Sequence, residues 1–302
     1  MFKNFLPFTR LAKLTLLSAI ALNLWVSPAF AGDPFRTKDP KKIGDQTEAA
    51  FKAIFQQGDY SAAEKYLEQA QSKEPNEPLV YALKASLAYG KNDLAALEKY
   101  SKKTLEVGQK LTFADPLRGN LYTGVGHFLE GATIITREGA VNGASSALSR
   151  LRKVYQYFDQ AEAIAPKDPE LNLIRGYMDL MLSVNLPFAS PEQAIERLEK
   201  NAAPGYLVYR GIALAYRDLK QYQSALNYAN QAVNATPSNP EIYYLRAQIY
   251  HELAKPDNNK TFLKEAIANF DKALAKKSQL PASLVRQIES ERKQATQRLQ
   301  NR

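Results

Sequence analysis

The sequence predicts an all-α protein, a superhelical solenoid of antiparallel helix hairpins with insertions and a C-terminal capping helix. Three observations predict this fold. Nearly the same eleven residues occur three times, each copy begins with Pro-x-x-Pro, and amphipathic patterns with helical spacing flank the copies, which are residues 75–85, 166–176 and 237–247. Repetition of a helical unit is typical of proteins in which stacked hairpins bury one continuous core.

Each Pro-x-x-Pro motif combines the end of one helix with the start of the next. The first proline stops a helix because it has no N–H to donate and its ring clashes with the preceding turn. The second proline opens a helix, where the missing donor costs nothing and φ is already helical. The connection is therefore short, and the two helices must pack as antiparallel neighbours. Ligands of proline-binding domains share this motif, but the amphipathic flanks favour the helix boundary.

Residues 1–31 have the pattern of a secretory signal peptide. Lys3, Arg10 and Lys13 precede an apolar stretch over residues 14–26, and Ala-Phe-Ala ends the segment. This stretch is shorter than the roughly 20 residues of a membrane span, and Ala-x-Ala suits signal peptidase. We therefore expect cleavage, export to the periplasm or an equivalent extracytoplasmic compartment, and no membrane span in the mature chain. An uncleaved anchor is the alternative. The polar residues 32–44 predict a flexible N-terminal arm.

Composition excludes several classes of chemistry. The 302 residues include no cysteine, which excludes disulfides, thiolate metal sites and thiol catalysis. The formal net charge is +9, and three of the positive charges lie in residues 1–31. On an exported chain, a moderate positive charge favours anionic proteins, polysaccharides or membrane surfaces, although a solvated surface without a specific partner is the commoner cause. We expect no nucleic-acid partner.

Residues 206–239 carry aromatic and small residues at regular positions, namely Tyr209, Ile212, Ala213, Tyr216, Tyr222, Ala225, Ala232 and Pro237. This pattern resembles the tetratricopeptide repeat, a 34-residue helix hairpin, and we think of exported bacterial members of that family. The small residues let helix backbones approach closely, and the tyrosines fill the space between hairpins. The resemblance implies a superhelix with a concave binding groove, and it implies no catalysis.

The resemblance divides residues 45–302 into four parts. We expect N-terminal repeats over 45–108, an atypical glycine-rich long hairpin over 109–168, C-terminal repeats over 169–281 and a capping helix over 282–302. The last segment is polar and rich in charge, as the exposed face of a terminal unit must be. The three motifs begin at 75, 166 and 237, so their spacing of 91 and 71 residues departs from the 34-residue rhythm.

Six of the fourteen glycines lie within residues 119–143, at positions 119, 124, 126, 131, 139 and 143. Each costs about 1 kcal/mol relative to alanine inside a helix, so a compensating gain is expected. Close approach of two helix backbones is one explanation, because glycine has no side chain in the way. The other is a special hairpin that binds a partner or a second copy of this chain, which would make the protein a homo-oligomer.

No constellation of catalytic or metal-binding residues is visible. Gly124-Val-Gly126 lacks the third glycine and the preceding strand of a nucleotide-binding loop. His127 and Glu130 could share one helix face, but His251 lies far from them, and metal sites normally need three or four ligands. We therefore predict no enzymatic activity, no catalytic residue, no metal site and no cofactor.

The resemblance also implies which residues face the groove, because the second, fifth, ninth and twelfth positions of each first helix do so in this family. The resulting partner-binding groove contains Tyr177, Arg210, Leu214, Arg217, Tyr244, Gln248 and His251. Arg210 and Arg217 are two helical turns apart and point the same way. Together with the tyrosines they could hold an acidic or C-terminal peptide segment. In that case, glutamate at both positions abolishes capture and leaves melting nearly unchanged. The alternative is that both arginines pair with internal carboxylates or are merely solvated.

The sequence thus predicts a non-catalytic scaffold or assembly factor that binds another protein or peptide segment outside the cytoplasm, through a concave helical groove. A protein that binds envelope polysaccharide, or an accessory subunit of an envelope enzyme complex, is the alternative. In that case the glycine-rich hairpin would be the docking element.

Overall fold

The computed structural model describes residues 32–185 and 191–300, and it confirms the all-α fold. The predicted signal peptide lies outside these residues. Within the described ranges the chain contains no strand and forms thirteen α-helices, with a π-helical turn at Ala53–Gln57 and a 3₁₀ turn at Lys277–Gln279. The helices are α1 Asp45–Lys52, α2 Tyr60–Lys73, α3 Pro78–Gly90, α4 Leu94–Leu111, α5 Pro116–Asn142, α6 Ala144–Ile164, α7 Pro169–Asn185, α8 Pro191–Asn201, α9 Gly205–Asp218, α10 Tyr222–Ala235, α11 Pro240–Leu253, α12 Lys260–Leu274 and α13 Ala282–Gln300.

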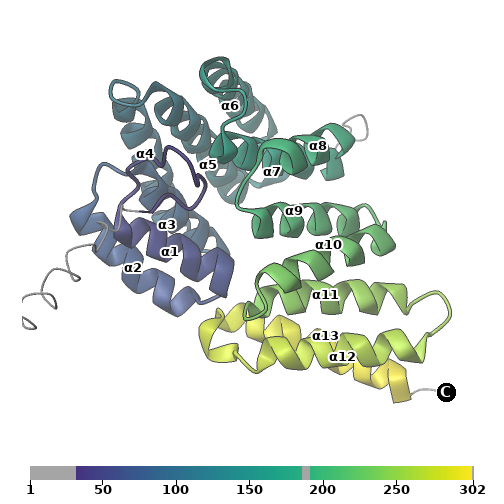
Figure 1. Ribbon diagram of the computed structural model, residues 1–302. Coiled ribbons are helices and arrows are strands. Elements are labelled where there is room, and N and C mark those ends of the chain that lie inside the picture. The colour runs from purple at the N-terminus through teal and green to yellow at the C-terminus, as the bar shows by residue number, and fades with distance from the viewer. Residues whose placement is uncertain (1–31, 186–190, 301–302) are drawn as a thin grey trace, which may run out of the picture.

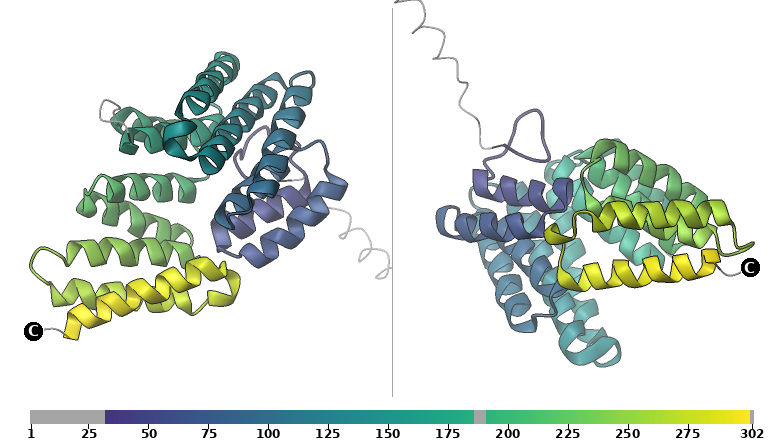
Figure 2. Two further views of the ribbon diagram at one scale, coloured as in Figure 1. Left: turned by 180° about the vertical axis from the view of Figure 1, so that it is seen from behind. Right: turned by 90° about the horizontal axis from the view of Figure 1, so that it is seen from below.

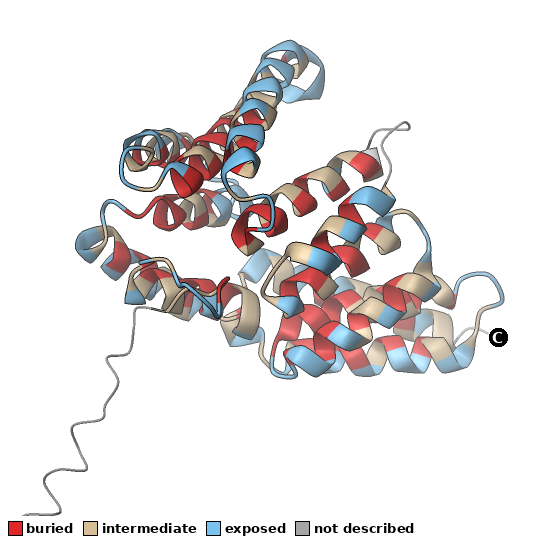
Figure 3. Cartoon of the chain, turned by 45° about the horizontal axis from the view of Figure 1, so that its top comes forward, coloured by how far each residue is buried: buried red, intermediate tan, exposed pale blue. Residues whose placement is uncertain are grey.

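Successive helices pack as six hairpins, α1–α2 through α11–α12, and α13 packs on α12 at the end of the array. In Figure 1 the last helices, α9 to α13, form one stack, while α4, α5 and α6 lie at the opposite side of the molecule. The buried residues form a stripe along each helix, and the outer faces are exposed (Figure 3). Each hairpin therefore buries its apolar side against its neighbours, as in a solenoid.

The three Pro-x-x-Pro motifs form the predicted helix boundaries. Helices α3, α7 and α11 begin at the second proline of each motif. The residue before that proline caps the new helix, since Glu77, Asp168 and Asn239 each accept a backbone N–H of the first turn at 2.9 Å. Such caps satisfy donors that have no partner within the helix.

The same three capping side chains also bind distant parts of the chain. Glu77 pairs with Arg118 on α5, Asp168 pairs with Arg36 in the N-terminal segment, and Asn239 donates to the carbonyl oxygen of Phe55 at 3.0 Å. One position of the repeated motif therefore serves both the local helix start and the packing of segments far apart in sequence.

Residues 32–44 are packed against the helices, which corrects the prediction of a flexible arm. Phe35 is buried, and its ring centroid lies 4.9 Å from that of Phe51 on α1. Ile43 is fully buried, and the guanidinium of Arg36 pairs with Asp33, Asp168 and Glu170. The prediction failed because two apolar side chains and one arginine, spread among polar residues, anchor the segment.

A buried network of charges joins this segment to α3, α5 and α7. Arg118 makes two bonds of 2.9 Å to Glu77 and a third of 2.9 Å to Glu170, whose other oxygen accepts the Tyr122 hydroxyl at 2.6 Å. Burial alone would raise the pKa of Glu170, but Arg118 and Arg36 outweigh it and hold that pKa below its ordinary value. Removal of one partner would leave a buried charge without a counterion, which typically costs about 3–5 kcal/mol.

The first hairpin also contacts the beginning of α11, so the two ends of the superhelix meet. The Tyr60 hydroxyl donates to Glu241, and Arg210 on α9 pairs with the same carboxylate. Gly58, in the turn between the two helices of the first hairpin, lies so close to α11 that a Cβ atom there would be 2.6 Å from the Asn239 side chain. The three orientations of Figures 1 and 2 show the first hairpin next to the C-terminal helices.

Most of the glycine-rich segment lies in α5, the longest of the described helices with 27 residues, which pairs with α6, a helix of 21 residues. A Cβ at Gly119 would lie 2.3 Å from the backbone of the turn that follows α4. A Cβ at Gly126 would lie 2.6 Å from the backbone of α4 itself. Close backbone approach therefore explains these two glycines. Gly139 has a different role, because its φ of 79° interrupts α5 near the tip of the hairpin.

Candidate functional site

Two adjoining cavities form an apolar trough on the inner side of the helix array. Their volumes are about 650 and 510 Å³, and both are lined by Ser86, Phe128, Leu129 and Met181. We define the apolar trough as these two cavities together. The side chains that carry its apolar character are Phe35, Phe51, Phe55, Leu79, Leu83, Tyr89, Val125, Phe128, Leu129, Ile135, Leu148, Leu151, Leu173, Tyr177, Met178, Met181 and Leu207.

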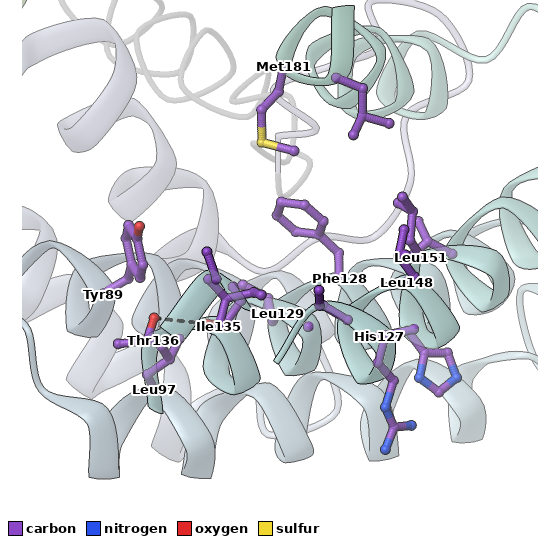
Figure 4. Close-up of a pocket in the computed structure, with 18 of the residues that line it drawn as sticks. Tyr89, Leu97, His127, Phe128, Leu129, Ile135, Thr136, Leu148, Leu151 and Met181 are labelled. Atoms are coloured by element: carbon purple, nitrogen blue, oxygen red, sulfur yellow. Dashed lines mark hydrogen bonds between the residues drawn. The ribbon is translucent and has the colours of Figure 1, made fainter. Parts of the chain in front are cut away.

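The solenoid brings these residues together from the first helices of five hairpins. Helices α1, α3, α5, α7 and α9 line the trough, with α6 and the N-terminal segment at its sides. In the close-up of Figure 4, Met181 on α7 points toward Phe128 on α5, with Tyr89 on one side and Leu148 and Leu151 on the other. Methionine and aromatic side chains adapt to different apolar surfaces, which suits a binding site for a protein segment.

Several polar groups that line the trough already have partners inside the protein. The Tyr122 hydroxyl donates to Glu170, the Tyr177 hydroxyl donates to the carbonyl oxygen of Leu207 at 2.6 Å, and the Thr136 hydroxyl donates to that of Ala132 at 2.8 Å. Burial raises the pKa of Tyr177, so its hydroxyl keeps its proton at neutral pH. The trough therefore offers mainly apolar contact, and few hydrogen bonds to an occupant.

The predicted groove residues divide among four places. Tyr177 lines the apolar trough, whereas Leu214 is half-buried and packs against an apolar cluster formed by α9, α10 and α11. The side chain of Arg210 is 21% exposed and pairs with the internal carboxylate Glu241, as our alternative for that residue predicted. Glutamate at position 210 would therefore face Glu241 and lower stability, which corrects the expectation that melting stays nearly unchanged.

Three predicted residues, Arg217, Gln248 and His251, line a separate polar pocket of about 530 Å³ between α9, α11 and α13. Arg217 donates to Asp218 at 2.8 Å and to Gln248 at 2.7 Å. Tyr244 lies beside this pocket, and its hydroxyl donates to Glu291 of α13 at 2.7 Å. The C-terminal helix thus supplies one wall of the polar pocket.

His251 is buried in the wall of the polar pocket, and its Nε2 atom has no hydrogen-bond partner among the described residues. Burial lowers the pKa of its imidazole, and the nearby cations Arg298 and Lys255 lower it further. The carboxylates Glu252 and Glu291 oppose this effect without reversing it. The ring is therefore neutral at neutral pH.

Within the described ranges, no group of three or more His, Cys, Asp or Glu side chains could hold a metal ion. His127 contacts Glu130 at 3.2 Å, and its ring stacks on Tyr157. Residues 124 and 126 face Phe158 and the backbone of Leu105, so this Gly-x-Gly segment is part of a packed interface. In the same ranges no helix has the length and hydropathy of a membrane span.

Sequence reasoning missed the apolar trough because its residues are scattered. Phe128, beside the glycines of α5, and Met181, near the end of α7, are 53 positions apart. A partial signal existed, since the glycines of α5 face α4 and α6 and leave Val125, Phe128 and Leu129 for another face. The sequence does not show that α7 passes over this face of α5.

Comparison with known proteins supports the repeat architecture over the C-terminal part of the chain. Residues 208–239 and 240–274 match the family model of the tetratricopeptide repeat. These two units are tetratricopeptide-like. The two matched units correspond to the α9–α10 and α11–α12 hairpins, where the sequence pattern was clearest.

Among solved structures, the chain is similar to one in the crystal structure of the APC/C hetero-tetramer Cut9–Hcn1. The sequence identity is 13% and the TM-score is 0.34, with 83% of this chain and 48% of that chain covered. This chain therefore spans about half the length of that protein. No curated protein sequence matches this chain.

Proposed function

We propose that this protein is a non-catalytic scaffold or assembly factor that binds a segment of a partner protein in the apolar trough. The tetratricopeptide-like fold supports a role in protein–protein interaction. The observation that carries the proposal is the trough itself, because two adjoining cavities with aromatic and methionine side chains can bury several apolar side chains of a partner.

The proposed place of action is outside the cytoplasm. The support is the pattern of residues 1–31, in which three positive charges precede an apolar stretch and an Ala-x-Ala site. Mass spectrometry of the mature protein checks this expectation. We expect the mature chain to begin at Gly32 and to fractionate with extracytoplasmic proteins, whereas a chain that starts at Met1 in the cytosol contradicts it.

Site-specific photocross-linking tests where the partner binds. A photoreactive amino acid at Tyr89, which is 58% exposed and lines the trough, should cross-link a defined partner through an apolar peptide. The same probe at Phe113, an exposed apolar residue outside the trough with 95% exposure, is the matched control. Equal yields of the same product from both positions would refute the proposal.

A charge placed in the trough should abolish capture. Met181 lines both cavities and is 41% exposed, so Met181→Glu should fold and place a carboxylate where the partner's apolar side chains bind. We expect at least about tenfold weaker binding, because burial of an unpaired charge costs several kcal/mol. Phe113→Glu adds the same charge elsewhere and should bind normally. Binding by titration and melting by circular dichroism separate this effect from misfolding.

Binding of envelope polysaccharide, or service as an accessory subunit of an envelope enzyme complex, is the second candidate. The polar pocket favours it, because side chains with hydrogen-bonding groups, Lys220 and Gln294 among them, line it beside the Tyr222 ring. The test is retention of the protein on isolated cell-wall glycan. If Gln248→Ala reduces this retention and Met181→Glu does not, the result supports this second function. Two further proposals remain. Binding of an acidic peptide segment at Arg217 can be tested by the same titrations, and self-association through the glycine-rich hairpin can be tested by light scattering.

A further inference from the structure

The apolar trough cannot satisfy the backbone of an extended peptide. Each residue of such a peptide carries one N–H and one C=O group, and each of these groups costs about 1–3 kcal/mol when it is buried without a partner. The hydroxyls of Tyr122, Tyr177 and Thr136 already donate within the protein. Ser86 and Tyr89 have no bond within the described residues, and two hydroxyls cannot serve a whole segment. An α-helix satisfies its own backbone groups and brings only side chains to the trough.

Exposed apolar side chains from three helices border the mouth of the trough. Its exposed apolar side chains, Tyr89, Leu148 and Met181, belong to α3, α6 and α7, and are 58%, 56% and 41% exposed. They border the larger cavity from three different helices (Figure 4). A helix is about 10–12 Å wide and presents side chains in several directions, so it suits a rim made by three helices better than a single thin acyl chain does.

The charges at one side of the trough favour acidic residues on the occupant. Arg150 lines the larger cavity and also a neighbouring hollow of about 360 Å³ that contains Arg137, Glu138 and Lys153. Glu130 is shared by Arg150 and His127, and Glu138 is paired with Arg137. Glu98 also lies 3.9 Å from Arg137, but it pairs with Lys102 at 2.7 Å. Four cations, Arg137, Arg150, Lys153 and Lys102, thus stand against three carboxylates that are already engaged, which leaves this edge positive.

Resting on the function proposed above, we propose that the occupant of the apolar trough is an amphipathic α-helix of the partner whose apolar stripe is flanked by acidic residues. The apolar stripe enters between Phe128 and Met181. The acidic flank lies along the α5–α6 hairpin, near Arg150 and Lys153.

Three synthetic peptides of about 18 residues test this inference, a length at which an amphipathic helix forms on a binding surface. The first places leucine at i, i+3, i+4 and i+7 with glutamate beside the stripe. The second contains the same residues with leucine at every other position, as in a strand, and the third replaces glutamate by lysine. We expect the first peptide to bind the full mature protein at least about tenfold more tightly than the others in fluorescence anisotropy, and to gain helicity on binding.

Two variants connect this binding to the trough. Met181→Glu should abolish binding of the first peptide, and Lys153→Glu should weaken it while strengthening the lysine peptide. Lys293→Glu, a surface charge change of the same kind on α13, is the control and should alter neither.

Equal or tighter binding of the strand-patterned peptide would overturn the helical occupant. So would displacement of the first peptide by a fluorescent fatty acid that binds more tightly, because the trough would then be a lipid site. Failure of every peptide also overturns the inference. The cross-linking from position 89 tests the proposed function separately, since it reports a natural partner whatever its conformation.

Discussion

His251 is one of two histidines in the chain, and it is buried beside four charged groups. Arg298 and Glu291 approach it from α13, while Glu252 and Lys255 follow it closely in the sequence. Because its pKa in the folded protein is lowered, the unfolded chain takes up a proton at a higher pH than the folded protein does. The resulting loss of stability begins as the pH falls below the ordinary histidine pKa of about 6.5 and grows toward lower pH.

We therefore expect the melting temperature to fall between pH 7.5 and 5.5, and His251→Gln to reduce this fall. Thermal melts of both proteins at a series of pH values measure the effect. His127→Gln is the control for the other histidine. Parallel melting curves for wild type and His251→Gln across this range would show that the imidazole does not titrate as its surroundings imply.

At the residue scale, the sequence predicted the helix boundaries better than the partners of charged side chains. The prolines at 78, 169 and 240 determine where helices start because their effect is local. The partner of Arg210 is Glu241, 31 positions away on another helix, and the Tyr60 hydroxyl reaches the same carboxylate from the first hairpin. Nothing local to Arg210 indicates that its side chain lies in an interface between hairpins.

At the scale of elements, the glycines of α5 provide a matched pair of substitutions within one helix. A Cβ at Gly126 would lie 2.6 Å from the Cα of Leu105, whereas a Cβ at Gly131 meets the nearest side-chain atom at 3.6 Å, an ordinary contact. Gly126→Ala should therefore push α4 and α5 apart and destabilise the protein by about 1–3 kcal/mol. Gly131→Ala should stabilise it by up to about 1 kcal/mol, because alanine favours the helix.

Urea denaturation of the two variants measures both changes. Opposite signs are expected, with the midpoint lowered for Gly126→Ala and raised for Gly131→Ala. A raised midpoint in both would mean that helix propensity alone determines the effect, and that α4 and α5 do not depend on close backbone contact at this point.

The elements were predictable from the sequence, but the contacts between distant elements were not. The repeated motif and the helical periodicity indicate hairpins, since both are local properties. The apolar trough depends on how far each hairpin rotates relative to the previous one, and the long α5–α6 hairpin departs from the regular repeat. The packed segment 32–44 likewise depends on Asp168 and Glu170, which lie more than 130 residues from Arg36.

At the scale of the whole molecule, Asn239 tests the contact between the first hairpin and the C-terminal repeats. Its side chain caps α11 and also donates to the carbonyl oxygen of Phe55, whereas Asn259 has only the cap of α12 to make. Asn259→Ala should therefore cost about 1 kcal/mol. Asn239→Ala should cost about 1 kcal/mol more, because it also leaves the Phe55 carbonyl without its partner.

Chemical denaturation gives the two values, and hydrogen exchange locates the effect. We expect Asn239→Ala to lose protection from hydrogen exchange around residues 53–60, and Asn259→Ala to keep it. Equal costs for the two variants would indicate that the bond to Phe55 contributes nothing to the closed arrangement.

The meeting of the first hairpin with α11 changes how this chain should fold. In an open array each unit touches only its neighbours, so stability accumulates unit by unit and the ends fray independently. Here residues near 58 and 240 touch, and about 180 residues must be gathered before that contact forms, which slows folding. Loss of the first hairpin would consequently weaken units far along the chain, and the ends of this array should melt together.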